Sequence, residues 1–184
     1  MKLNYCWNVN TVNDKKGCGA MYRPILKLPK TKYEKVLDCI GGGLFIVSII
    51  LVILNWGELP DKIPAHFNGA GEVDRWGARI EIFILPGIGL LMWIFLGLLE
   101  KAPHMHNYPD RLNERNVEAF YLNSRKLCNE LKNFCLMLFA ILSCEMLFVA
   151  LGKIEDIGWW FLPFVLIGAG IPIVKGLIAS SRIE

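Results

Sequence analysis

The sequence predicts an all-α membrane protein: a four-helix transmembrane bundle with an ordered exterior loop and a cytoplasmic amphipathic helix. Three observations lead to this prediction. The 184-residue chain is 54% hydrophobic, its apolar residues gather in four long blocks, and its lysines and arginines are unevenly distributed between those blocks. The composition excludes a disordered chain, which contains few apolar residues. A net charge of only +3, with the basic residues spread along the chain, argues against nucleic acid as a partner.

Four stretches are apolar and close to the length of about 20 residues that a helix needs to cross the hydrocarbon of a bilayer. The first three cover residues 39–57, 82–99 and 133–152, and the fourth covers residues 157–174. Glu145, in the third stretch, is the one charged residue inside them. Soluble cores rarely produce four such stretches in so short a chain, so we interpret each as a membrane span that contacts the lipid bilayer.

The spans divide the chain into three parts. Residues 1–20 are polar and are predicted to form a disordered tail. Residues 21–152 form a membrane domain with the first three spans, and residues 153–184 contain the fourth span and a short C-terminal tail. Residues 113–132 carry apolar side chains at near-helical spacing, which predicts an amphipathic helix that lies on the inner leaflet or runs into span three.

The basic residues predict how the chain is oriented in the membrane. Eight lysines and arginines precede the first span and six lie between spans two and three, whereas three lie between spans one and two and one between spans three and four. Because basic residues accumulate in cytoplasmic loops, both termini are predicted to be cytoplasmic and residues 58–79 exterior. Four basic residues of the inner segment could contact anionic lipid or a cytoplasmic partner: Arg111, Arg115, Arg125 and Lys126.

The exterior loop is short and dense in polar side chains, prolines and glycines. Its candidate binding residues are Asp61, Pro64, His66, Phe67, Asn68, Gly71, Glu72, Asp74, Trp76 and Arg79. On an extended segment, residues two apart face the same side, so His66 would lie with Asn68, and Glu72 with Asp74.

Three roles remain open for these side chains. Histidine and carboxylate groups could hold a divalent metal ion. They could instead structure a turn through hydrogen bonds, with Asp74 paired to Arg75 or Arg79, or they could form a surface that binds a peptide or protein partner.

Two further features place polar groups at unusual positions. Glu145 lies about 10 Å from the exterior end of span three, where an acid is costly and usually faces the interior of a bundle. It could couple to a proton or ion, or it could form a hydrogen bond to Ser48 or Ser143. On the cytoplasmic side, His104 and His106 could share a metal ion, although an ordinary solvated role at the membrane surface explains them as well.

The loop strings LPDKIPAHFN (Leu59–Asn68) and GEVDRW (Gly71–Trp76) resemble the signature of a bacterial membrane family, domain of unknown function 1648, found at the N-terminal end of SdpI-like toxin-immunity proteins. Arg79 stands near the position where that family commonly has a lysine. The resemblance extends over about residues 21–150. It includes a cytoplasmic motif formed by Asn107, Tyr108, Pro109, Asn116 and Tyr121.

This resemblance implies a protein of the bacterial inner membrane that confers immunity to a toxic peptide or senses it. The implied partners are that peptide, a repressor or another membrane protein, and no cofactor is implied. The sequence contains no P-loop, dinucleotide fingerprint, nucleophile elbow or zinc-protease helix, so we do not expect an enzyme. The alternative hypothesis is a small transporter or a metal-dependent membrane enzyme that uses His66, Asp74 and Glu145.

Overall fold

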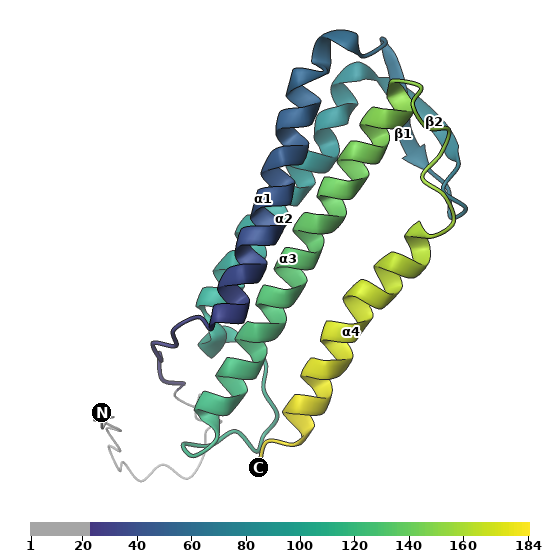
Figure 1. Cartoon of the computed structure of the whole chain (residues 1–184). Coiled ribbons are helices and arrows are strands. Elements are labelled where there is room, and N and C mark those ends of the chain that lie inside the picture. The colour runs from purple at the N-terminus through teal and green to yellow at the C-terminus, as the bar shows by residue number, and fades with distance from the viewer. Residues whose placement is uncertain (1–22) are drawn as a thin grey trace, which may run out of the picture.

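The chain folds into an elongated bundle of four helices (Figure 1). The structure is a computed structural model that describes residues 23–184, so the tail predicted at residues 1–20 lies outside the described part. The helices are α1 (Lys32–Leu54), α2 (Ile84–Lys101), α3 (Val117–Ala150) and α4 (Phe161–Ser181). Each is long and apolar enough to cross a membrane, α2 together with the 3-10 turn that precedes it. The predicted class, a four-helix membrane protein, is therefore confirmed.

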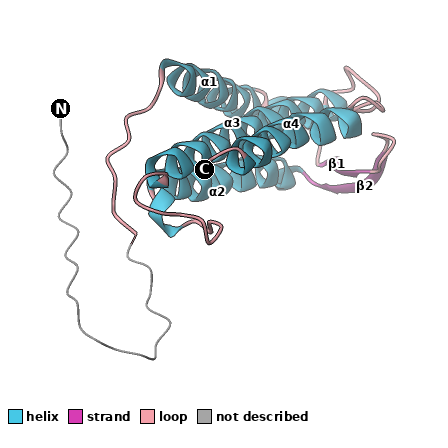
Figure 2. Cartoon of the chain, turned by 90° about the horizontal axis from the view of Figure 1, so that it is seen from below, coloured by secondary structure: helices cyan, strands magenta, loops and turns pink. Residues whose placement is uncertain are grey.

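Helix α3 is the central element of the bundle. It packs against each of the other three helices, and Figure 2 shows it among them in a view from below. Of the apolar stretch of α3, 44% is buried inside the protein, whereas the corresponding stretch of α4 is not buried at all. The outer helices therefore present their apolar side chains to the surroundings, as expected where lipid covers them.

Helix α1 begins seven residues before the apolar stretch that predicts it. Thr31 and Glu34 form a capping box: the Thr31 hydroxyl accepts from the Glu34 amide at 3.3 Å, and the Glu34 carboxylate accepts from the Thr31 amide at 2.7 Å. These bonds satisfy amide groups at the helix start that have no partner within the helix. The cap therefore extends α1 beyond its apolar part.

Helix α3 is also longer than its apolar part. Its 34 residues include the segment predicted as an amphipathic helix, which continues without a break into the third span. The predicted helix of residues 113–132 begins four residues later than expected, at Val117, because residues 113–116 form turns.

The loop between α1 and α2 contains an antiparallel hairpin of β1 (Lys62–Phe67) and β2 (Val73–Ala78). The sequence predicts an ordered loop here but not these strands. We call the end of the bundle that carries them the hairpin end. Its core consists of buried side chains from α1, the hairpin loop and α3: Val52, Leu59, Ile63, Ile82, Met146 and Leu147.

The opposite end, which we call the polar end, contains residues 23–31, residues 102–116 and the C-terminus (Figure 1). Arg111 donates to the Ser180 carbonyl at 2.6 Å, and Asn116 donates to the Glu184 carbonyl at 3.2 Å. These bonds join the C-terminal end of α4 to the segment before α3.

Candidate functional site

The hairpin is closed by a turn that the Asn68 side chain organises. The Asn68 carboxamide oxygen accepts from the amides of Ala70 at 2.9 Å and Glu72 at 3.1 Å, and its nitrogen donates to the Glu72 carboxylate at 2.9 Å. Asparagine favours turns because its side chain can take the place of a backbone acceptor. Asn68 and Glu72 thus serve the turn structure, one of the roles left open by the sequence.

Gly71 fixes the hairpin to the loop between α3 and α4. Its φ of +89° lies in the left-handed region, and its carbonyl accepts from the Ile157 amide at 3.0 Å. A Cβ at this position would approach the backbone of Gly158 to 2.6 Å, closer than real side chains come. Only glycine meets both requirements without strain.

Across the strands, His66 Nδ1 lies 2.6 Å from Asp74 Oδ1, at an exposed position. This contact differs from the predicted pairing of Asp74 with Arg75 or Arg79. A shift in the strand register after Pro64 places His66 beside the β2 residues 74–75. The cross-strand neighbour therefore takes the place of the neighbours in sequence.

The two arginines have other partners. Arg75 donates to the Glu81 carboxylate at 2.9 Å and to the Ala65 carbonyl at 3.1 Å. Arg79 lies over the ring of Trp56, with its guanidinium carbon 4.7 Å from the ring centroid. Such cation–π contacts are worth about 0.5–1 kcal/mol at exposed sites, so the Arg79 side chain helps to hold the hairpin loop against the end of α1.

The remaining loop candidates have different environments. The carbonyl of Asp61 accepts from the Arg79 amide at 3.0 Å, and the side chain of Pro64, on β1, is fully buried. Phe67 packs against the core of the hairpin end, whereas Trp76 on β2 is 56% exposed. Asp61, Pro64 and Phe67 therefore support the loop, and Trp76 is available to its surroundings.

A cavity of about 240 Å³ lies beneath the hairpin. It is enclosed by β1, the start of α2, the last third of α3 and the segment that leads into α4. Its polar lining residues are His66, Asn68, Arg75 and Glu81, and its apolar ones are Ala65, Phe67, Ile84, Leu85, Leu142, Met146, Ile157 and Phe161. The cavity therefore has an apolar floor and a polar rim, the composition that ligand sites commonly have.

The structure does not bring together the three residues of the transporter or enzyme hypothesis. His66 and Asp74 are in contact, but Glu145 is not among the residues that line the cavity with His66. Within residues 23–184, no group of three or more histidine, cysteine, aspartate or glutamate side chains is arranged to hold a metal ion. His66 and Asp74 are thus brought together by the hairpin, whereas Glu145 lies apart from their contact.

The predicted partners of Glu145 are engaged elsewhere. Ser48 donates to the Phe45 carbonyl at 2.8 Å, and Ser143 donates to the Phe139 carbonyl at 2.7 Å. Each serine hydroxyl thus donates within its own helix, and no hydrogen bond joins either serine to Glu145 among the described residues. A serine in a helix readily bonds to a carbonyl one turn earlier, which removes it as a donor to other groups.

The cytoplasmic motif predicted from the sequence forms an aromatic cluster at the polar end. Tyr108 stacks on Tyr121 with ring centroids 5.3 Å apart and donates to the Pro103 carbonyl at 2.8 Å. Burial raises the pKa of Tyr108 to about 12, so it stays protonated. Asn107 and Pro109 are exposed on either side of it. This cluster is distant from the hairpin and is a packing element.

The two histidines of this region do not form a pair. Both ring nitrogens of His106 are engaged, Nε2 with the Leu99 carbonyl at 3.0 Å and Nδ1 with the Ser124 hydroxyl. Burial lowers the pKa of His106 below its ordinary value. A nitrogen that already has a hydrogen-bond partner is not free for a metal ion, so the shared metal site with His104 finds no support in this geometry.

The polar end contains a network of buried charges that the hydropathy pattern does not predict. Glu34, Glu100, Arg125 and Lys132 are each at most 4% exposed. Lys132 contacts Glu100 and, at 2.8 Å, Asp38. Arg125, predicted to meet lipid or a partner, is instead buried against Glu34 through two bonds of 3.0 Å.

Amide and lysine side chains complete this network. Asn129 and Asn133 donate to Asp38 at 2.9 Å and 2.8 Å. Lys30 contacts Asp38 at 2.6 Å and also Glu100. Burial alone would lower the pKa of Lys30, but its bonds to these two carboxylates outweigh burial and raise it. The 3–4-residue spacing of polar side chains from Arg125 to Asn133 is the signal that could have located this network.

Part of the chain is similar in sequence to a known protein. An uncharacterized protein of Archaeoglobus fulgidus is 29% identical over 103 residues, which cover 51% of this chain and 55% of that protein. The chain thus spans about half the length of this curated relative. No solved structure matches the chain.

Residues 43–90 match the family described as Domain of unknown function (DUF1648). The match runs from α1 through the hairpin into α2, so it contains every candidate binding residue of the loop, whereas the second predicted motif, at residues 107–121, lies outside it. The resemblance predicted from the loop is thereby confirmed for residues 43–90, which are similar to the DUF1648 family.

Proposed function

We propose that this protein is a membrane receptor of the toxin-immunity or sensor type, which binds a peptide at its hairpin end. The observation that supports the proposal is the cavity beneath the hairpin, with its apolar floor and its rim of His66, Asn68, Arg75 and Glu81. The asymmetry of the basic residues favours an orientation with this end outside the cytoplasm. A peptide released by a neighbouring cell would meet it there.

The size of the cavity favours a peptide over a compact small molecule. A volume of about 240 Å³ is below the roughly 300–1,000 Å³ of pockets that enclose drug-sized ligands. It suits one or two apolar side chains, with the rest of the ligand outside. An anchor that fills such a pocket commonly supplies most of the binding energy of a peptide.

The surroundings of the cavity offer contacts for the remainder of a peptide. The hairpin has two strands, and β2 presents Asp74, Arg75 and Trp76 as exposed side chains. An extended peptide can add to a free strand edge through main-chain hydrogen bonds. The Arg75–Glu81 pair at the rim could exchange its contacts with those of a charged peptide group at low cost, because exposed ion pairs are worth only about 0–1 kcal/mol.

This proposal is tested by comparing the growth of a strain that lacks the gene for this protein with the growth of its parent strain. The probe is the low-molecular-mass fraction of medium from a dense culture of the parent strain. We expect the fraction to inhibit the deletion strain and to lose this activity after protease treatment. Expression of the wild-type chain should restore growth, and so should Leu138→Trp, which alters the same helix but not the cavity lining. Leu142→Trp, which fills the cavity, should fail to protect.

Two results would contradict the proposal. The first is growth of the deletion strain equal to that of the parent in the fraction, which would show that no peptide of this kind is present. Alternatively, Leu142→Trp protects as well as wild type at the same level in the membrane, which excludes the cavity as the binding site.

A further inference from the structure

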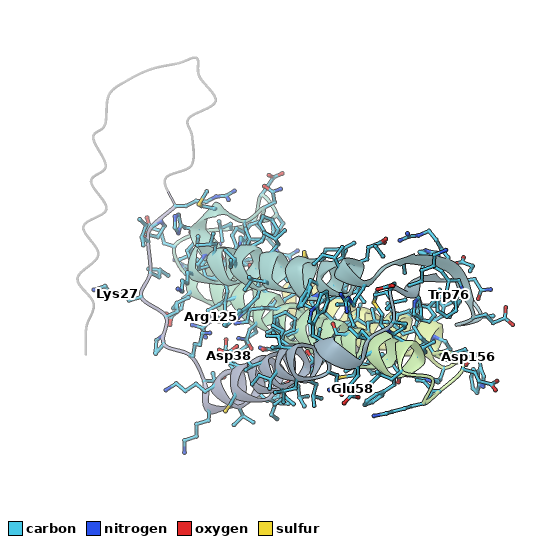
Figure 3. The ribbon with its side chains drawn as sticks, turned by 90° about the horizontal axis from the view of Figure 1, so that it is seen from above. Lys27, Asp38, Glu58, Trp76, Arg125 and Asp156 are labelled. Carbon is cyan, nitrogen blue, oxygen red and sulfur yellow. The ribbon has the colours of Figure 1, made fainter. Side chains whose placement is uncertain are left out.

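The segment 23–31, which we call the strap, crosses the polar end of the bundle as an extended chain. The Arg125 guanidinium donates to the Leu28 carbonyl at 2.6 Å, and Lys30 bonds to Asp38 and Glu100. In Figure 3, Lys27 lies on the outer side of the strap, whereas Arg125 and Asp38 lie on the side of the strap that faces the helices. The strap is thus held at defined points, with space on either side of Lys30.

Two cavities occupy this space. One, of about 500 Å³, lies beneath the strap and is lined by strap residues together with Glu100, Lys101, Pro103 and Arg125. The other, of about 440 Å³, lies against α2, where Trp93, Ile94, Gly97 and Leu98 line it. Lys30, Glu100 and Lys101 line both cavities, so the two meet at these residues.

The charges around the cavities do not balance. Asp38 and Glu100 are neutralised by Lys30 and Lys132, and Arg125 is paired with Glu34. Lys27 and Lys101 are exposed, and neither has an acidic side chain within 4 Å among residues 23–184. An unpaired positive charge therefore remains where the two cavities meet, which favours an anionic ligand.

The second cavity continues onto the apolar outer face of α2. Trp93 is 40% exposed, Ile94 53% and Leu98 61%, and these side chains lie on a helix that crosses the membrane. In a bilayer this face is covered by acyl chains. The cavity therefore connects an acyl environment along α2 with a cationic environment at its end, which is the arrangement of chemical groups in an anionic phospholipid.

We propose that the polar end binds one anionic phospholipid, independently of any peptide at the hairpin. Its phosphate lies between Lys27 and Lys101, and one acyl chain follows Leu98, Ile94 and Trp93 along α2. The ion pairs of Asp38 and Glu100 make the site tolerant of an anion, because their carboxylates are already neutralised by lysines. The strap then links the lipid headgroup to the buried charge network through Lys30.

Native mass spectrometry of the full chain in detergent tests this site. The probes are phosphatidylglycerol and phosphatidylcholine with identical acyl chains, and inorganic phosphate as a third arm. We expect one phosphatidylglycerol molecule to be retained in preference to phosphatidylcholine. Loss of each lysine should weaken retention roughly fivefold, so the double variant Lys27→Gln/Lys101→Gln should lose most of it.

The matched control is Lys32→Gln/Lys35→Gln, which removes the same charge from exposed positions of α1 that line neither cavity. This control should retain phosphatidylglycerol as wild type does. An equal loss in both double variants would show general surface attraction and overturn the proposal. Equal retention of the two lipids would also overturn it, as would displacement of phosphatidylglycerol by excess inorganic phosphate, which would identify a site for free anions.

Discussion

Replacing Arg125 by methionine should destabilise the protein strongly, because it leaves the Glu34 carboxylate buried without its cation. Glu34 is fully buried and Arg125 is 4% exposed, and two parallel bonds of 3.0 Å join them. Removing one partner of such a pair costs about 3–5 kcal/mol. Thr31 still donates to Glu34 at 2.7 Å, so we expect the lower part of this range, about 3 kcal/mol.

The double replacement Glu34→Met/Arg125→Met separates the net contribution of the ion pair from the cost of leaving one charge buried without its partner. With both side chains replaced, no charge remains buried without a partner, so the loss should fall to roughly 1 kcal/mol or less. Thr31 loses its capping partner in this variant, and this accounts for the remaining loss. The free energy of unfolding is measured by titration of detergent-solubilised protein with a denaturing detergent, followed by circular dichroism. Arg115→Met, at an exposed position, is the control for the loss of an arginine.

Additive losses of unfolding free energy in the single and double variants would contradict this prediction. If the double variant loses the sum of the single losses, the coupling energy between the two side chains is near zero and they do not form a buried pair. A loss below roughly 1 kcal/mol in Arg125→Met alone would have the same meaning, since that is the upper value for exposed ion pairs.

Three further changes test other parts of the structure. Gly71→Ala forces an alanine into the left-handed region and against the backbone at residue 158, so it should cost at least roughly 1–2 kcal/mol and increase amide hydrogen exchange in the hairpin. Thr31→Ala removes the cap of α1 and should cost about 1 kcal/mol in the same unfolding titration. The folded pKa of His106 lies below its ordinary value of 6.5, so its contribution to stability is complete above pH 6.5 and is lost as the pH falls through the folded pKa. The melting temperature should therefore fall with acidification, less steeply in His106→Gln than in His104→Gln; equal slopes would contradict this role of burial.

The helices could be predicted because each contains a long apolar stretch, a signal that depends on neighbouring residues alone. The ends of α1 and α3 could not be predicted in this way. Their polar turns are helical because Glu34 caps one helix and pairs with Arg125 on the other, a contact between residues 91 apart. A hydropathy pattern does not contain such long-range partners, so it assigns these charged side chains to the surface.

In the loop as well, the sequence pattern does not predict which side chains are in contact. Its prolines and glycines predict order, and its signature predicts the family. The contact between His66 and Asp74 depends on the register shift after Pro64, which brings the two side chains together across the strands. Spacing along the chain predicts which residues share a face, but the pairing of strands determines which residues meet.

The composition of α3 has a mechanical consequence. Its 34 residues span about 50 Å at 1.5 Å per residue and include neither glycine nor proline, the residues at which helices most often bend. Leu142 and Met146 at one end line the hairpin cavity, while Arg125 and Lys132 near the other end belong to the charge network. One end of α3 thus contributes to a mostly apolar cavity, and the other contributes to a group of buried charges. The backbone of α3 therefore connects the hairpin cavity to the charge network without a residue type at which helices commonly bend.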